Sequence, residues 1–105
     1  MFYTFIQNNS GGFFDADDDV APYVIIEAGS AKKANARAMD KGIYFNGVSK
    51  GMDCPCCGDR WYTVDMVDAT DEPEIYGSKS FEHCSRWVEG HNIIIHYLDG
   101  RVERS

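Results

Sequence analysis

A continuous apolar strand followed directly by an alanine-rich helix constrains the fold of this chain more than any other feature. Tyr23 to Ala28 forms an almost unbroken apolar run, which is typical of a strand in a central position of a sheet. Ser30 then predicts a helix N-cap, Ala31 to Lys41 predicts the helix, and Gly42 predicts its end. Small side chains on one face would let this helix lie close against the sheet. The expected face comprises Ala31, Ala34, Ala38 and Met39.

The remaining segments predict an α+β fold. Strand patterns occur at Phe2 to Ile6, Arg60 to Val67 and Asn92 to Leu98. Asp99-Gly100 predicts a hairpin turn, after which Arg101 to Glu103 returns as an edge strand. Phe81 to Glu89 has the spacing of a short helix. We therefore expect an antiparallel sheet of about five strands packed against one main helix, with a cysteine-rich knuckle and a second short helix.

Length and charge limit the classes of function. The 105 residues predict a single domain, residues 1–105, with a formal net charge of −7 and a pI near 4.7. No apolar run approaches the roughly 18 residues that span a membrane, and no signal peptide is evident, so we expect a cytosolic protein with no membrane partner. The acidic charge argues against direct nucleic-acid binding and favours a protein partner with a basic surface. A merely soluble acidic domain is the plainer alternative.

The segment Cys54-Pro55-Cys56-Cys57-Gly58 has the form of a zinc knuckle. In this interpretation Cys54 and Cys57 supply two thiolates, and Cys56 is a spectator. Cys84 is the best third ligand and His83 the fourth, with His91 or His96 as substitutes. Two other interpretations stay open: a tight turn with small buried cysteines, and redox use of Cys-x-x-Cys, which lacks the strand-to-helix context it requires.

The acidic run between the first two predicted strands is a candidate cation or partner site. It comprises Asp15, Asp17, Asp18 and Asp19. The run lacks the glycine and the distal glutamate of a calcium loop, so a solvated loop is the simpler interpretation. Further carboxylates between residues 65 and 74 would add to an electrostatic face only if the fold brings them together.

Two polar groups are candidate ligand sites. Arg60, Trp61 and Tyr62 would recognise a phosphate or a base through a guanidinium fork and aromatic stacking. The alternative is a core tryptophan with Arg60 paired to Asp59 or Asp65. Gln7, Asn8 and Asn9, beside Gly11-Gly12, would line a pocket or simply satisfy the turn. His96 has the setting of a structural histidine, and no catalytic motif is present.

Six pieces of the sequence are familiar when taken together. They are Tyr3 to Gly12 with its Gln-Asn-Asn-Ser-Gly-Gly turn, Tyr23 to Ala28, Ser30 to Gly42, the knuckle with Asp59-Arg60-Trp61-Tyr62, Pro73 to Gly77, and His96 to Gly100. In these pieces the chain resembles a family of small, uncharacterised proteins encoded by tailed bacteriophages. The resemblance implies an accessory protein acting in the bacterial cytoplasm. It implies no catalytic residue.

Three functions follow as hypotheses. The first is a non-enzymatic acidic binding module that inhibits or redirects a host protein, such as a defence protein or a nucleic-acid-binding protein. The second is an oligomer that sequesters a small nucleotide signal. The third is a zinc-stabilised protein with a cryptic enzymatic activity, for which a zinc-bound water or a cysteine nucleophile is the only route.

Overall fold

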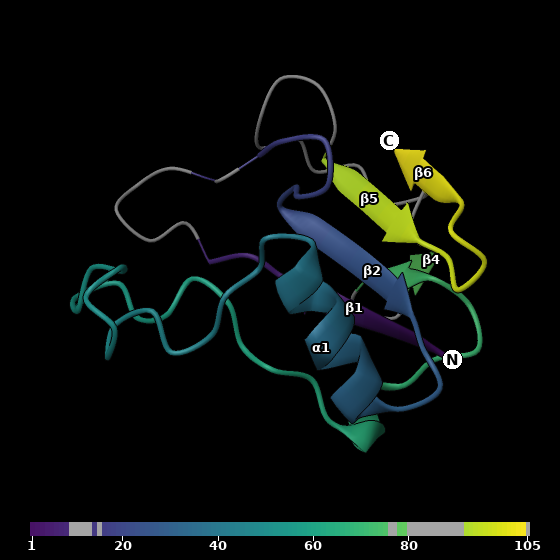
Figure 1. Cartoon of the computed structure of the whole chain (residues 1–105), viewed down its shortest axis with the longest axis horizontal. Helices are drawn as coiled ribbons and strands as arrows, with labels where there is room; N and C mark the ends of the chain where they lie inside the picture. The colour runs from purple at the N-terminus through teal and green to yellow at the C-terminus, as the bar shows by residue number, and fades with distance from the viewer. Residues whose placement is uncertain (9–13, 15, 76–77, 80–91, 105) are drawn as a thin grey trace.

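The fold is a four-stranded mixed sheet with one helix lying across one of its faces (Figure 1). The computed structural model describes residues 1–8, 14, 16–75, 78–79 and 92–104. The strand order in the sheet is β1-β2-β5-β6, and β3 and β4 form a separate two-stranded ladder. The bounds are β1 Phe2–Ile6, β2 Tyr23–Glu27, α1 Ala31–Asp40, the 3-10 helix η2 Met66–Asp68, β3 Glu74–Ile75, β4 Ser78–Lys79, β5 Ile93–His96 and β6 Val102–Arg104.

The expected α+β class is confirmed, but the central pair of strands is parallel, so the sheet has four strands and is mixed rather than an antiparallel sheet of about five. β1 pairs antiparallel with β2, and β6 pairs antiparallel with β5, as hairpin-like neighbours do. Between β2 and β5, however, Tyr23 lies opposite Ile93 and Ile26 opposite His96, which is a parallel register. The chain leaves β2 through α1 and a long excursion, and such a crossover permits parallel pairing. The central position expected for the apolar strand is confirmed, since β2 lies between β1 and β5.

Helix α1 begins and ends close to where the sequence predicts. The Ser30 hydroxyl accepts a hydrogen bond from the backbone N–H of Lys33, and Gly42 follows the C-cap with a φ of 101°. Ala34 and Ala38 are buried against the sheet. Met39 is 56% exposed, which corrects the expected apolar face: it lies about 100° around the helix from Ala38 and so points away from the sheet.

The segment predicted as a strand between Arg60 and Val67 forms no strand. The side-chain amide of Asn35 on α1 accepts a hydrogen bond from Val64 N at 2.9 Å and donates one to Val64 O at 3.0 Å. One helix side chain thus satisfies the two backbone groups that a sheet neighbour would have used. The chain then enters η2, where Asp65 and Asp68 form a reciprocal capping box. The predicted second helix, Phe81 to Glu89, falls outside the described residues.

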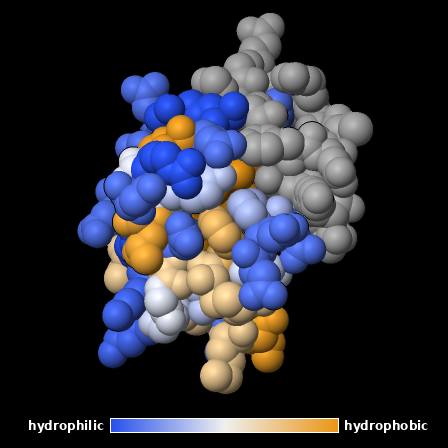
Figure 2. Space-filling model, turned by 90° about the vertical axis from the view of Figure 1, so that its right-hand side faces the viewer, coloured by the Kyte–Doolittle hydropathy of each residue, from blue (hydrophilic) through white to orange (hydrophobic). Residues whose placement is uncertain are grey.

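Alternating residues of the strands build a core on each face of the sheet. The larger cluster lies between the sheet and α1 and includes Phe5, Val24, Ile26, Phe45 and Trp61. The other face carries a smaller cluster, which comprises Tyr23, Ile25, Ile93 and Ile95 with Phe2 and Tyr97 packed against it. Figure 2 shows hydrophobic groups at the foot of the side view, at the level where Figure 1 places η2.

His96 is fully enclosed at the end of β5. Its Nε2 lies 2.9 Å from the carbonyl oxygen of Asp19, while no hydrogen-bond partner in the described structure reaches its Nδ1. Burial lowers the pKa of this imidazole, and the cations of Lys41 and Arg37 add to that effect, while Asp19 opposes it. The neutral ring therefore donates from Nε2, so the expected structural histidine is satisfied at one nitrogen only.

We expect an NMR titration to give His96 a pKa below the ordinary histidine value of about 6.5. The unfolded chain then binds this proton more readily than the folded one. The contribution of His96 to the free energy of unfolding is complete above about pH 6.5 and declines as the pH falls toward the folded-state pKa. A measured pKa at or above the ordinary value would contradict the neutral, buried ring.

Candidate functional site

The loop between Phe45 and Trp61 carries three of the four cysteines and extends beyond the end of β1 (Figure 1). Its base is a turn in which Asn46 has a φ of 59°. The carbonyl oxygen of Gly47 accepts hydrogen bonds from Met52 N at 2.8 Å and from Asp53 N at 3.1 Å. These bonds bring Asp53 back beneath the turn, so that its side chain points into the molecule.

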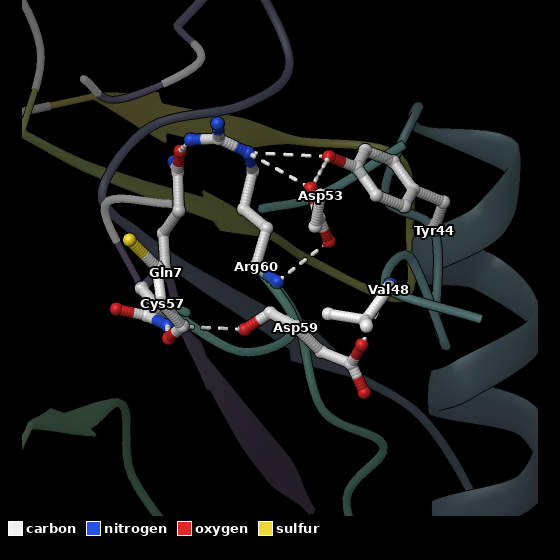
Figure 3. A network of polar contacts seen from close by, with 8 residues as sticks. Gln7, Tyr44, Val48, Asp53, Cys57, Asp59 and Arg60 are labelled. Carbon is white, nitrogen blue, oxygen red and sulfur yellow. Dashed lines mark hydrogen bonds and ion pairs between the residues drawn. The ribbon is translucent and has the colours of Figure 1, made fainter. Parts of the chain in front are cut away.

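Asp53 and Arg60 form a buried ion pair that closes this loop (Figure 3). Arg60 Nε lies 3.8 Å from Asp53 Oδ1, and the two side chains are 4% and 0% exposed. Arg60 Nε donates to Tyr44 Oη at 3.2 Å, and Tyr44 Oη donates to Asp53 Oδ1 at 2.6 Å. Asp53 Oδ2 accepts the backbone N–H of Arg60 at 2.8 Å. Each charge is thereby paired and hydrogen-bonded, which buried ions require.

The same arginine ties the loop to the end of β1. Arg60 Nη1 donates to Gln7 Oε1 at 2.9 Å, and Gln7 Nε2 donates to Ala21 O at 3.2 Å. Asn8 Nδ2 donates to Cys57 O at 2.7 Å and to Asp59 O at 3.2 Å. Asn8 therefore holds the loop at Cys57 in place, a role that neither prediction gave it, since its amide satisfies a distant loop rather than its own glycine-rich turn. Asn9, the other asparagine of that prediction, lies outside the described residues.

Tyr44 remains a hydrogen-bond donor because the pKa of its phenol is raised. Burial raises the pKa of its phenol, and the hydrogen bond to the Asp53 carboxylate raises it further, while Arg60 opposes the shift. A neutral phenol between a cation and an anion accepts from one and donates to the other. The phenol of Tyr44 therefore keeps its proton at neutral pH and donates it to Asp53 Oδ1.

The cysteine loop (Cys54 to Gly58) is a tight turn that gathers three sulfur atoms. Cys57 N and Gly58 N both donate to Cys54 O at 3.1 Å, and Gly58 has a φ of 85°, a conformation that favours glycine. Cys54 Sγ lies 2.7 Å from Cys56 Sγ, and the three thiols of Cys54, Cys56 and Cys57 lie within 4.8 Å of one another. This spacing is close enough for them to bind one metal ion.

The three thiols differ in exposure and in acidity. Cys54 is half-buried, whereas Cys56 and Cys57 are exposed, so the tight-turn interpretation with small buried cysteines does not describe them. The hydrogen bond from the Cys56 thiol lowers the pKa of Cys54, and the backbone N–H of Cys56 adds to that effect. The same contact raises the pKa of Cys56, because a second thiolate would face the first.

Cys56 is the main difference between the expected and observed cysteine arrangements. The sequence pattern Cys-x-x-Cys selects Cys54 and Cys57 and leaves Cys56 as a spectator. In the structure the turn brings Cys56 Sγ against Cys54 Sγ. His83 and Cys84, the other expected ligands, and His91, one of the substitutes, lie outside the described residues. His96, the other substitute, is buried against Asp19.

The proposed guanidinium and aromatic site is not assembled at the surface. Arg60 is 3% exposed and Trp61 is 1% exposed, and only Tyr62, at 59%, faces solvent. Arg60 pairs with Asp53 rather than with Asp59 or Asp65, the partners that the sequence suggested. Asp59 Oδ1 instead accepts the backbone N–H of Val48 at 2.9 Å. Trp61 lies in the core, as the alternative interpretation had it.

The acidic residues do not form one face. Asp17 Oδ1 accepts the backbone N–H groups of Asp19 and Val20, and Asp18 O accepts two hydrogen bonds from Arg104 on the edge strand β6. Residues 65–74, the acidic segment, lie at the opposite edge, where Thr70 pairs with Phe2 of β1. The sheet separates the two groups. Asp15 lies outside the described residues.

Sequence patterns gave no sign of Asp53 or Tyr44. Asp53 precedes the first cysteine in a loop rich in glycine, a position typical of a solvated residue. Tyr44 lies in the apolar stretch Ile43 to Phe45 after the helix, a setting typical of a core side chain. The one residue nearby that reflects this arrangement is Gly47. A Cβ at Gly47 would overlap the Asp53 carboxylate, so the position excludes a side chain.

Comparison with known proteins identifies a family but no activity. A protein-family model described as "Domain of unknown function (DUF7296)" matches residues 1–105. The chain therefore belongs to this family. No curated protein and no solved structure matches it. Within the described residues, no helix combines the length and apolar character needed to cross a membrane.

We expect Arg60→Ala to lower the free energy of unfolding by about 3–5 kcal/mol, because it leaves the Asp53 carboxylate buried without its cation. The matched control is Arg101→Ala, which removes an ion pair with Asp99 whose side chains are 66% and 62% exposed. That change should cost much less than Arg60→Ala, even with loss of the contact of Arg101 with the Tyr97 ring, because solvent screens an exposed pair. Denaturant unfolding measures both. Equal losses for the two variants would contradict the structural role of Arg60.

Gly47→Ala tests the close approach of Asp53 to the turn. The added Cβ would lie 2.5 Å from Asp53 Cγ and 2.8 Å from Tyr44 Cε2, so the ion pair must shift. We expect a loss of about 1–3 kcal/mol or more in the free energy of unfolding. Gly29→Ala is the control, since its Cβ meets nothing nearer than the flexible Lys33 side chain at 3.9 Å. A Gly47→Ala protein as stable as this control would show that the turn tolerates a side chain.

Proposed function

We propose that this chain is a non-enzymatic recognition module that binds a protein partner with a basic surface. The observation that carries the proposal is the composition of the acidic segment and its surroundings. Residues 61–74 contain five carboxylates and no lysine or arginine. Asp65, Asp68, Asp71 and Glu72 are exposed. Such a concentration of one charge steers a partner of opposite charge toward the surface.

The acidic segment is held in a defined conformation. The capping box fixes η2 at its start. Phe2 and Thr70 exchange backbone hydrogen bonds of 2.8 and 2.9 Å. Thr4 Oγ1 donates to Glu74 O at 2.6 Å, which anchors its end to β1. A surface ordered before binding loses less conformational entropy when a partner arrives, which favours affinity.

Two apolar side chains lie within the charged surface. Met66 is 75% exposed and Val67 is 86% exposed, next to each other on η2. Protein interfaces combine an apolar centre with a polar rim, and methionine is enriched in them. The exposed side chains of Met66 and Val67 therefore favour a protein as the partner over a small soluble ion.

The resemblance to tailed-bacteriophage proteins supplies the biological setting of this proposal. In that setting the chain is a phage accessory protein that acts in the cytoplasm of a bacterial host. Its partner is a host protein whose basic surface serves defence or nucleic-acid binding, which the chain would inhibit or redirect. A bound zinc ion at the cysteine loop would stiffen the protein without taking part in partner binding. The burial of Arg60 and Trp61 gives no support to sequestration of a nucleotide.

Affinity capture with three baits tests the proposal. The first is the wild-type chain, and the second carries Asp71→Asn and Glu72→Gln in the acidic segment. The third is a control with Asp18→Asn and Asp40→Asn, two exposed acids elsewhere, so both variants change the formal charge from −7 to −5. We expect a bacterial protein that the wild type and the control retain at low salt and release at high salt. The acidic-segment variant should retain it poorly.

The captured protein, once identified, gives the quantitative result. Loss of two surface charge pairs should weaken its Kd for the chain by about 2- to 30-fold. The control should leave the Kd close to that of the wild type. Equal binding by both variants, or capture that does not respond to salt, would refute an electrostatic interface at the acidic segment.

A further inference from the structure

We propose that Cys54, Cys56 and Cys57 bind a single Zn²⁺ ion through three thiolates, with the fourth coordination position open to solvent. This inference is independent of the partner proposed above, because it concerns a different surface loop. It also differs from the set that the sequence suggests, since it includes Cys56 and needs neither His83 nor Cys84. It rests on where the turn places the three sulfurs.

The distances between the sulfur atoms are close to those that a bound zinc ion requires. With Zn–S bonds of about 2.3 Å and tetrahedral angles, two sulfurs on one ion lie about 3.8 Å apart. Cys54 Sγ and Cys56 Sγ are 2.7 Å apart, and all three sulfurs lie within 4.8 Å of one another. Each pair thus has to change its separation by no more than about 1.1 Å. Rotation of the exposed Cys56 and Cys57 side chains can supply this without disturbing the core.

The backbone that carries the thiols is fixed in advance. Cys54 O accepts both Cys57 N and Gly58 N, which closes the turn. Asn8 Nδ2 donates a hydrogen bond to Cys57 O at 2.7 Å. Asp53 precedes the turn and Arg60 follows it, so their ion pair fixes both of its ends. A cysteine turn anchored in this way loses little backbone entropy on binding an ion. Only side-chain rotation and loss of the three thiol protons accompany metal binding.

The donor set selects the class of metal and leaves a position free. Thiolates are soft ligands that select Zn²⁺ over hard cations such as Mg²⁺ or Ca²⁺. Within the part of the chain that the structure describes, the cluster holds three ligands and no fourth histidine, cysteine or carboxylate. Two of its three cysteines are exposed, so the remaining position faces solvent. A water molecule would complete the coordination there.

Titration of the full-length, reduced protein with Co²⁺, a spectroscopic substitute for Zn²⁺, tests this site. The intensity of the thiolate-to-cobalt charge-transfer band reports the number of thiolates, and competition by Zn²⁺ reports the affinity. We expect one ion per chain with three thiolates. Cys54→Ser, Cys56→Ser and Cys57→Ser should each remove about a third of the band and weaken the ion's Kd by at least about tenfold. Circular dichroism checks that each variant folds.

Cys84→Ser is the control that separates the two ligand sets, and we expect it to bind the ion as the wild type does. Full binding by Cys56→Ser together with loss in Cys84→Ser would overturn the proposal in favour of the knuckle set. Loss in both variants would overturn the open fourth position, since four thiolates would then close the site. Absence of a charge-transfer band in the wild type would overturn the site altogether. None of these results depends on capture of a partner.

Discussion

The buried ion pair of Asp53 and Arg60 is the interaction on which the arrangement of the loop depends. Neither residue belongs to a helix or a strand, yet together they connect the turn at Gly47, the phenol of Tyr44 and the end of β1 at Gln7. A charge enclosed in a medium of low polarity is tolerated only with a partner, so the loop must close in the one way that brings these two side chains together. The cysteines between them are consequently placed at the surface, with their backbone held by the closure beneath.

This use of Arg60 also shapes the outer surface. An arginine that neutralises Asp53 inside the molecule cannot neutralise carboxylates outside it, and the acidic segment contains no cation of its own. At the other edge of the sheet, the Asp17–Asp19 run is occupied with backbone hydrogen bonds and with Arg104. The two acidic regions therefore differ in character despite similar composition. One belongs to a turn that supports β2 and β6, and the other presents its charge together with Met66 and Val67.

Elements stabilised by local interactions were predictable from the sequence. The apolar run of β2, the helix from its Ser30 cap to Gly42, and the Asp99-Gly100 turn all have short-range causes, and all are present. The errors arose where a distant residue decided the outcome. Asn35 takes the hydrogen bonds of Val64 and removes the strand expected there. The parallel pairing of β2 with β5 depends on a connection of more than sixty residues, whose path no local pattern indicates.

The candidate site divides in the same way. The sequence by itself determined that a turn at Cys54 to Gly58 would gather thiols, because proline and glycine fix a short backbone segment whatever surrounds it. Only the tertiary structure decided which thiols meet, that Arg60 and Trp61 lie inside, and that Asn8 supports the turn from fifty residues away. The physical reason is that burial of a charge or an aromatic ring depends on groups contributed by the whole chain, whereas a turn depends on its own residues alone.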